Sequence, residues 1–405
     1  MPPLRGRTEA SAPPEGEPEP QELDADEEIA ALEEDEAEDH RVAALLSDHR
    51  RMASVALVFV VGVVGIYLVL PKIVGFDDSL SRIHDAEWYW VVVAVLFCVA
   101  QFVAYVALFR GVLGGKDDSA VRRRLDTKVS YQITMAGLAA TRIFSAAGAG
   151  GILLTYWALR KAAMPRRRSA CRMVAFLVLT YSVYLAALIV FGVLLRTGVL
   201  PGDDPVGGTI VPAGVAGAVI LVLGLVALIP GDVERRLSGV AGDTRAARLA
   251  QKLATGPPMV ATGVRTAVDY IAHPSRGALA VAGAVGFWAA QIGILWASFE
   301  AFGASVPFAV LVQGFFVGMA ANLIPSPAGG VGSVDAGMIG AFVLFGVDKE
   351  VVFPAVLTYR VIAFWLPIPP GVIAYFQLRR TVARWEGERR GSDYTSQSKV
   401  KAEAT

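Results

Sequence analysis

The residues best placed to do chemistry are two charged side chains that fall within apolar stretches, Asp335 and Arg360. An ionisable group at membrane depth is costly to bury and by default indicates a functional site. Arg360 lies about ten residues into the apolar stretch 351–376, which is roughly 14 Å along a helix. Its planar guanidinium offers donors that fit a phosphate or a carboxylate. The sequence therefore predicts that Arg360 contacts an anionic group inside the membrane.

Asp335 follows a cluster of residues that interrupts helical structure. Proline removes a backbone donor, and glycine permits left-handed or closely packed backbone. The cluster consists of Pro325, Ser326, Pro327, Gly329, Gly330 and Gly332. We expect Ser333 to cap a new helix, with Asp335 in its first turn. The free N–H groups at such a helix start attract anions, so a phosphate head group is the expected ligand.

Each of the two charged residues also has a structural interpretation. An acidic residue in the first turn of a helix, such as Asp335, complements the helix dipole. Asp335 and Arg360 can also form a buried ion pair that holds the broken segment to the following helix. These structural roles are compatible with binding of an anion, and both remain open.

Further polar residues within the apolar stretches are candidates for the same site. Arg142 lies in a second glycine-rich segment and is either another head-group contact or an edge residue that reaches the interface. Five other polar residues either line the same binding cavity or form interhelical hydrogen bonds. They are Gln101, Gln291, Gln313, Tyr181 and Tyr359. No catalytic or metal-ligating residue is predicted. The predicted substrate-binding set is Arg360, Asp335, Arg142, Ser333, Gly329, Gly330, Gly332, Asn322 and Tyr359.

The glycine-rich segments are parts of a repeat. Residues 140–151 (ATRIFSAAGAGG) and 321–332 (ANLIPSPAGGVG) agree at six of twelve positions without gaps. Downstream of each, VLTYSV at 178–183 is matched by VLTYRV at 356–361. Breaks at matching places in the two halves of a hydrophobic chain indicate a transporter built from repeats. An old duplication that now serves only packing is the alternative.

Composition indicates an all-α polytopic integral membrane protein. The chain has 405 residues, of which 54% are hydrophobic and 18% charged, against about 25% charged in soluble domains. Several apolar runs approach or exceed the ~18 residues that cross a bilayer. These runs are 53–70, 91–109, 173–195, 210–230, 278–299, 306–324 and 351–376.

Charge distribution predicts the topology. Basic clusters mark the cytoplasmic side, and they place both termini inside. The segment 129–160 then forms a hairpin that enters from the cytoplasm, whereas 306–346 forms a hairpin that enters from outside. We therefore expect two inverted-topology repeats, about 50–196 and about 209–378, each with a glycine-rich hairpin that is either broken or re-entrant.

The ends of the chain differ from its apolar middle. Residues 1–40 carry fifteen Asp and Glu but two Arg, which predicts that 1–48 is a disordered acidic cytoplasmic tail. A membrane domain is predicted at 49–380 and a disordered cytoplasmic tail at 381–405. Motifs such as HExxH, CxxC, the P-loop and GxSxG do not occur in the sequence, so we predict neither a cofactor nor a metal. Nucleic acid is not an expected partner.

Two stretches, NLIPSPAGGVGSVDAGMIGAFVLFGV and VLTYRVIAFWLPIPPGVIAYF, carry a resemblance to a known family. They resemble the lysylphosphatidylglycerol synthase transmembrane-domain family, also called flippase-like or UPF0104 proteins. The family pattern falls on Pro325, Pro327, Gly329, Gly330, Gly332, Asp335, Tyr359, Arg360 and Trp365. Two positions depart from it, because Asp335 stands where the family has Glu and Ala328 shifts the glycine pair by one.

The resemblance implies a flippase-like domain that moves aminoacylated phosphatidylglycerol between leaflets, without the soluble synthase domain. The predicted function is thus a lipid flippase or transporter in the bacterial plasma membrane, with an anionic or zwitterionic phosphate-bearing lipid as cargo. One alternative is a membrane-embedded enzyme such as a lipid-linked glycosyltransferase, with Asp77-Asp78 or Asp203-Asp204 as its paired acids. Another is a non-transporting partner of a separately encoded lipid synthase. Lipid identity, direction, energy coupling and homo-oligomerisation stay open.

Overall fold

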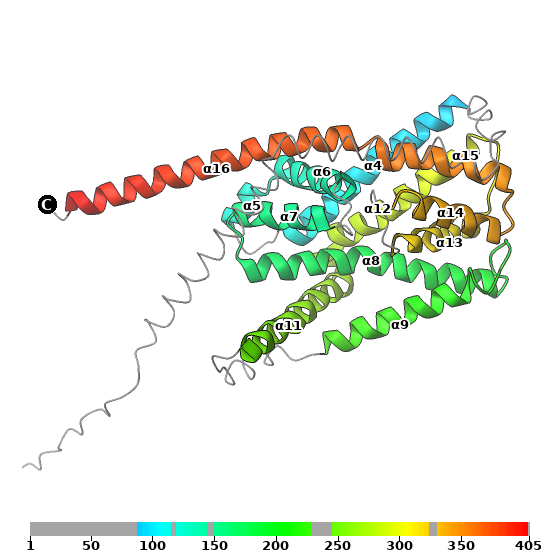
Figure 1. Ribbon diagram of the computed structural model, residues 1–405, viewed down its shortest axis with the longest axis horizontal. Helices are drawn as coiled ribbons and strands as arrows, with labels where there is room; N and C mark the ends of the chain where they lie inside the picture. The colour runs from blue at the N-terminus through cyan, green and yellow to red at the C-terminus, as the bar shows by residue number, and fades with distance from the viewer. Residues whose placement is uncertain (1–86, 115–118, 144–148, 229–244, 324–329, 404–405) are drawn as a thin grey trace, which may run out of the picture. The chain divides into compact units, whose positions relative to one another are not determined.

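A computed structural model describes residues 87–403, with gaps at 115–118, 144–148, 229–244 and 324–329 (Figure 1). The predicted acidic tail 1–48 and the apolar run 53–70 lie outside the described residues. All regular elements in the described part are helical. They are α4 (Trp88–Leu113), α5 (Ser119–Arg124), α6 (Thr127–Ile143), α7 (Ala149–Lys161), α8 (Arg166–Arg196), α9 (Ile210–Ala227), α11 (Arg245–Ala272), α12 (Pro274–Glu300), α13 (Phe308–Met319), η2 (Ala320–Leu323), α14 (Ser333–Leu344), α15 (Lys349–Arg360), η3 (Val361–Trp365) and α16 (Ile368–Glu403).

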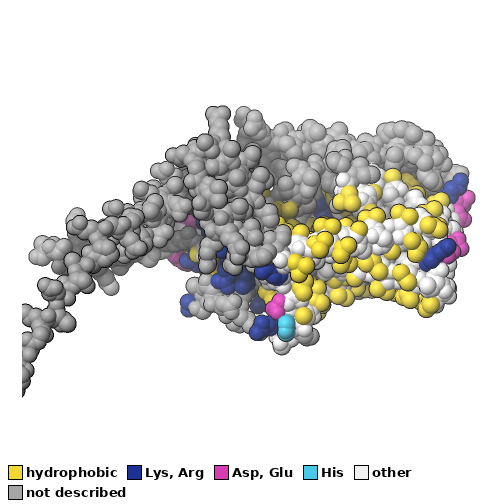
Figure 2. Space-filling view, turned by 90° about the horizontal axis from the view of Figure 1, so that it is seen from below, with side chains coloured by type: hydrophobic (Ala, Val, Ile, Leu, Met, Phe, Trp, Pro, Cys, Tyr) yellow, Lys and Arg dark blue, Asp and Glu magenta, His cyan; other side chains and the backbone are white. Residues whose placement is uncertain are grey.

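The prediction of an all-helical, multi-pass membrane protein is confirmed. In the described ranges, five helical stretches are long and apolar enough to span a bilayer. They are Trp88–Leu113, Arg166–Arg196, Ile210–Ala227, Ser275–Glu300 and Lys349–Glu388. Figure 2 shows hydrophobic side chains over the middle of one face, with Lys and Arg gathered mainly at one end and a smaller mixed group of charges at the other. This distribution is expected for a surface in contact with lipid.

Helices α4 and α12 pack antiparallel at unusually short range. Gly293 faces Phe97 near one end of the contact, and Gly111 faces Ala280 near the other. Between them, a Cβ atom on Gly283 would lie 2.4 Å from the backbone nitrogen of Leu108. Small residues allow such close approach of backbones in membranes, where dispersion contacts replace the hydrophobic effect as the source of helix association. The glycines are therefore what lets this pair form.

Two helical hairpins pack into the helices of the other half of the chain. The first hairpin consists of α6 and α7, and the second of α13, η2 and α14. The α-helical arms have 17, 13, 12 and 12 residues, or about 26, 20, 18 and 18 Å, short of the ~30 Å hydrocarbon core. Helix α6 of the first hairpin packs on α16, and α13 of the second packs on α8.

The apolar run 351–376 is not one continuous helix. Helix α15 ends at Arg360, a single π-helical turn covers Val361–Trp365, and α16 begins at Ile368. Three prolines, Pro367, Pro369 and Pro370, remove backbone donors just after the turn, which accounts for the interruption. A π-turn leaves carbonyl groups out of the regular hydrogen-bond ladder and is common at functional sites.

The stretch after residue 380 differs from the predicted disordered tail. Helix α16 continues through it to Glu403. The sequence 381–403 is charged, which suggested disorder, yet eleven of its 23 residues are Arg, Glu, Lys, Ala or Gln. These residues have high intrinsic helix propensity, and the helix extends from a start that is already formed, so no new nucleation is required.

We predict that Gly283→Ala destabilises the protein by about 1–3 kcal/mol, because the added methyl group meets backbone atoms that cannot move aside. The matched control is Gly217→Ala in α9, where nothing lies within 4 Å of the added Cβ. That change should be neutral or stabilising by up to about 1 kcal/mol through helix propensity. Thermal unfolding of the detergent-solubilised protein measures both. Equal melting temperatures for the two variants would contradict the close packing of α4 on α12.

Candidate functional site

The second glycine-rich segment ends in a backbone conformation that favours glycine. Gly330 and Gly332 have φ angles of +90° and +86°, which side-chain-bearing residues rarely adopt. Helix α14 begins directly afterwards at Ser333. Gly332 therefore holds the N-cap position, and the prediction that Ser333 caps the helix is wrong by one residue. The Oδ2 atom of Asp335 accepts a hydrogen bond from the N–H of Gly332 at 3.0 Å.

Asp335 and Arg360 form a buried ion pair. The Nε atom of Arg360 lies 2.5 Å from Oδ1 of Asp335, and each residue is only 5% exposed. The Nη2 atom of Arg360 also donates to the carbonyl oxygen of Gly330 at 2.9 Å. Arg360 thus joins the end of α15 to the start of α14 in the second hairpin. The predicted structural pairing of these two residues is present in the fold.

Arg142 is held by backbone carbonyl groups from a distant part of the chain. It stands in the last turn of α6, and its Nη1 and Nη2 atoms donate to the carbonyl oxygens of Phe364 and Ala363 at 2.6 and 2.8 Å. Both carbonyls belong to the π-turn after Arg360. Arg142 therefore supplies the partners that this turn lacks, and it links the first hairpin to the second half of the chain.

Phe364 joins the two arginines and was not singled out from the sequence. The centre of its ring lies 5.0 Å from the guanidinium carbon of Arg142 and 4.8 Å from that of Arg360. A ring face at this range attracts a cation. One signal for this role was available, because Phe364 follows Arg360 by four residues and so lies on the same helical face.

These residues surround a cavity of about 790 Å³. Both hairpins and α15 contribute to its wall, which includes Arg142, Asn322, Gly330, Tyr359 and Arg360 from the predicted set. The hydroxyl of Tyr359 donates to Oε1 of Gln291 at 2.7 Å, so this pair forms an interhelical hydrogen bond at the wall. Other polar wall residues are Tyr105, Thr134, Thr141, Thr155 and Tyr181.

Three residues of the predicted set do not line the cavity as described. Asp335 lies behind the wall and reaches the site through Arg360. Gly332 and Ser333 form the start of α14 without lining the cavity. Gly329 lies outside the described residues. Arg142 and Asn322, which come from the two glycine-rich segments, both belong to this one wall.

The charge balance at the cavity is positive. The described wall contains the guanidinium groups of Arg142 and Arg360 and no carboxylate, and Asp335 behind it compensates one of the two cations. Charges interact strongly where the surroundings are apolar and water is scarce. A surplus cation in such a cavity is stabilised by an anion, and a guanidinium fits the oxygens of a phosphate. The cavity is therefore suited to an anionic group.

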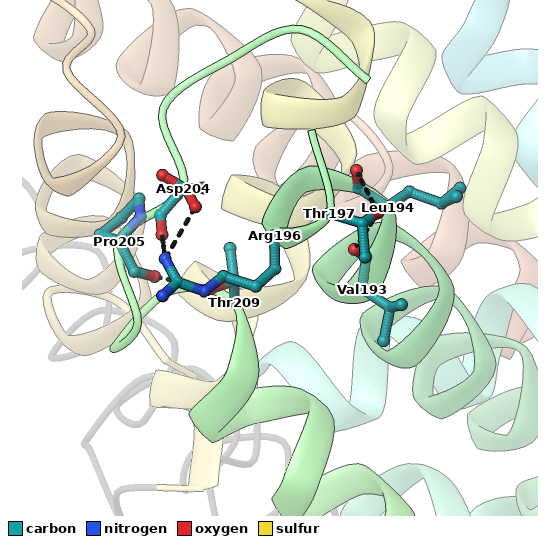
Figure 3. A network of polar contacts seen from close by, with 7 residues as sticks. All are labelled: Val193, Leu194, Arg196, Thr197, Asp204, Pro205 and Thr209. Carbon is teal, nitrogen blue, oxygen red and sulfur yellow. Dashed lines mark hydrogen bonds and ion pairs between the residues drawn. The ribbon is translucent and has the colours of Figure 1, made fainter. Parts of the chain in front are cut away.

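The paired acids considered for an enzyme lie elsewhere. Asp203 and Asp204 belong to the segment between α8 and α9, and Oδ2 of Asp204 lies 2.8 Å from Nη1 of Arg196 in a partly exposed ion pair (Figure 3). Thr209 donates to the carbonyl oxygen of Pro205 in the same network. These contacts stabilise the turn into α9. Asp77 and Asp78 lie outside the described residues.

Comparison with known proteins matches most of the chain. The family model described as Lysylphosphatidylglycerol synthase TM region matches residues 52–371. A protein named UPF0104 membrane protein from Methanothermobacter thermautotrophicus (strain Delta H) is 30% identical over 86 residues, which is 21% of this chain and 26% of that relative. The chain thus aligns with about a quarter of the length of this curated relative.

We predict strong coupling between Asp335 and Arg360 in a double-mutant cycle. Asp335→Ala leaves a buried guanidinium without its carboxylate and should cost about 3–5 kcal/mol, and Arg360→Met should cost a similar amount by stranding the carboxylate. The double variant removes both charges and should cost clearly less than the sum of the two. Unfolding in detergent measures all three variants. Additive losses would show that the pair does not act as a unit.

Proposed function

Because the chain belongs to the family of the lysylphosphatidylglycerol synthase TM region, we propose that it moves a phosphate-bearing lipid between the two leaflets of the membrane. The observation that carries the proposal is the cavity where Arg142 and Arg360 meet with a surplus of positive charge. An ionisable group within membrane-spanning segments is by default part of a pathway or a binding site. Because the description of the family names a phospholipid, we take the anion to be a lipid head group.

The phosphate would bind between the two arginines. Each guanidinium has five N–H donors. In the contacts described above, Arg142 donates through its two Nη atoms, and Arg360 uses Nε in its ion pair and Nη2 in its hydrogen bond. The remaining donors are available for phosphate oxygens. Asp335 would position Arg360 and limit the net charge, so that binding remains weak enough for release. The hydroxyl groups of Thr155 and Tyr181, on the same wall, would contact the rest of the head group.

The two halves would work as inverted-topology repeats. The reciprocal packing of the hairpins supports this arrangement, because α6 contacts α16 while α13 contacts α8. The helices that precede the two hairpins, α4 and α12, pack on each other. Repeats of this kind place a binding site at their interface near the bilayer midplane and expose it to the two sides in turn. No nucleotide-binding motif occurs in the sequence, so movement would be passive or coupled to an ion gradient.

Transport is favoured over the two alternatives. The enzyme alternative depends on paired outer acids, of which Asp204 is engaged by Arg196 at an exposed position. The scaffold alternative, a partner of a separately encoded lipid synthase, gives no reason for two arginines at a buried cavity. We place the protein in the plasma membrane with both termini in the cytoplasm, as the basic clusters indicate. A bound cofactor is not part of this proposal.

The proposal predicts that purified protein in liposomes moves a fluorescent phosphatidylglycerol analogue to the outer leaflet, where a quencher reaches it. Arg142→Gln and Arg360→Gln should each slow this movement between about ten- and a hundred-fold, the loss expected for a charge-assisted contact. Fluorescence quenching over time measures the rate. Equal rates for wild type and both variants would contradict a role for the cavity.

Arg196→Gln is the matched control, because it removes the same charge from an exposed ion pair outside the cavity. Its rate should equal that of the wild type. Reconstitution at equal protein content and size-exclusion profiles exclude loss of folding as the cause. The lipid is varied to phosphatidylethanolamine and to an aminoacylated phosphatidylglycerol, and a proton gradient is applied. Absence of movement under all these conditions would favour the enzyme and scaffold alternatives.

The inverted arrangement makes a separate prediction about accessibility. Thr127 is the first residue of α6 in the first hairpin, and Ser305 lies shortly before α13 in the second. Both residues are exposed. In a background with Cys98→Ala and Cys171→Ala, we expect Thr127→Cys to react with a membrane-impermeant maleimide from the cytoplasmic side only. We expect Ser305→Cys to react from the outer side only. Labelling of both from one side would contradict opposite orientations of the hairpins.

A further inference from the structure

A groove separate from the central cavity runs along the face of α4 that points away from the cavity. Its volume is about 830 Å³, and its wall is almost entirely apolar. Helix α4 contributes half of the wall residues, and the others come from α6, α12 and the segment after the π-turn. The wall along α4 includes Val99, Phe102, Val103, Val106 and Arg110.

The groove and the cavity share their separating wall. Helix α4 turns Tyr105 and Phe109 toward the cavity, but Phe102 and Val106 toward the groove. The residues that follow Arg360 also face both spaces, because Phe364 lines the cavity while Pro367 lines the groove. The two spaces thus lie on opposite sides of one layer of side chains, and occupation of one does not fill the other.

Charge is confined to one end of the groove. Arg110 stands in the last turn of α4, and Lys128 is the second residue of α6, so both lie at the end of the groove where α4 ends and α6 begins. Both side chains are exposed, and within the described ranges neither forms an ion pair. The nearby carboxylate of Asp126 is engaged, because its Oδ1 accepts from the N–H of Val129 at 2.7 Å and caps α6.

The dimensions match one membrane leaflet. Eleven residues separate Val99 from Arg110, which is roughly 16 Å along the helix. Half of the hydrocarbon core measures about 15 Å. A lipid whose phosphate lies at Arg110 and Lys128 would therefore extend its acyl chains along the apolar wall to about the bilayer midplane.

We propose that this groove is a binding site for one anionic phospholipid, with its phosphate between Arg110 and Lys128 and its acyl chains along Val99, Val103 and Val106. The occupant is anionic because the polar end of the groove presents two cations without a described partner. It is a lipid because the remaining wall is apolar over the depth of one leaflet. The site is independent of translocation and of the arginines in the cavity.

A photo-crosslinking amino acid at position 103 tests the proposal in the intact protein. Val103 lies in the middle of the groove and is 66% exposed. The protein is reconstituted into mixed vesicles in which either phosphatidylglycerol or phosphatidylcholine is radiolabelled. We expect a preference for phosphatidylglycerol on the order of ten-fold, because each basic group near the surface favours an anionic lipid. Arg110→Gln combined with Lys128→Gln should abolish that preference.

Two controls isolate the effect of the groove. The same crosslinker at Val222 in α9, a comparably exposed apolar position outside the groove, should label both lipids equally. The variant Arg123→Gln with Arg380→Gln removes two exposed charges outside the groove and should retain the preference at position 103. Equal labelling of both lipids at position 103 in the wild type overturns the proposal. Crosslinking of position 103 to the chain's own segment 53–70 overturns it as well, because that segment would then occupy the groove.

Discussion

The site depends on one constraint, that backbone polar groups within a membrane must find partners inside the protein. The chain breaks its helices twice at this place, before Ser333 and after Arg360. Each charged side chain of the site compensates one of these breaks. Asp335 accepts from the N–H of Gly332, Arg360 donates to the carbonyl of Gly330, and Arg142 donates to two carbonyls of the π-turn. The charges at membrane depth are therefore needed for the fold itself.

The same contacts determine the electrostatics of the cavity. Carbonyl oxygens are neutral acceptors, so the use of Arg142 and Arg360 to satisfy them brings two positive charges into an apolar region and Asp335 compensates only one. Phe364 lies against both guanidinium groups and adds attraction for them without cancelling charge. A neutral donor such as Asn could satisfy a carbonyl without creating this surplus. The choice of arginine thus links the stability of the breaks to the positive charge of the cavity.

The pairing of Asp335 with Arg360 could be predicted from the sequence, but the geometry around the pair could not. Depth in an apolar run and first-turn position were sufficient to single out Arg360 and Asp335 and to anticipate their pairing, because both signals depend on local spacing. The contacts of Arg142 could not be anticipated, since its acceptors lie in a π-turn inside what looked like a continuous apolar run. Only the prolines near 367 hinted at that break. The N-cap was misplaced by one residue because the side chain of Ser333 was expected to cap the helix, whereas the helix begins after Gly332, whose φ of +86° is not specified by local spacing.

The glycine contacts between α4 and α12 have a mechanical consequence. Where only a hydrogen atom separates the backbones, as at Gly283 beside Leu108, an axial slide of either helix would bring a side chain into space that is already filled. Packed surfaces of this kind have discrete arrangements and do not deform continuously. The pair therefore behaves as a stiff strut that resists sliding of one helix along the other. Any rearrangement of the hairpins must then be accommodated around this strut, in their short arms and in the π-turn that Arg142 holds.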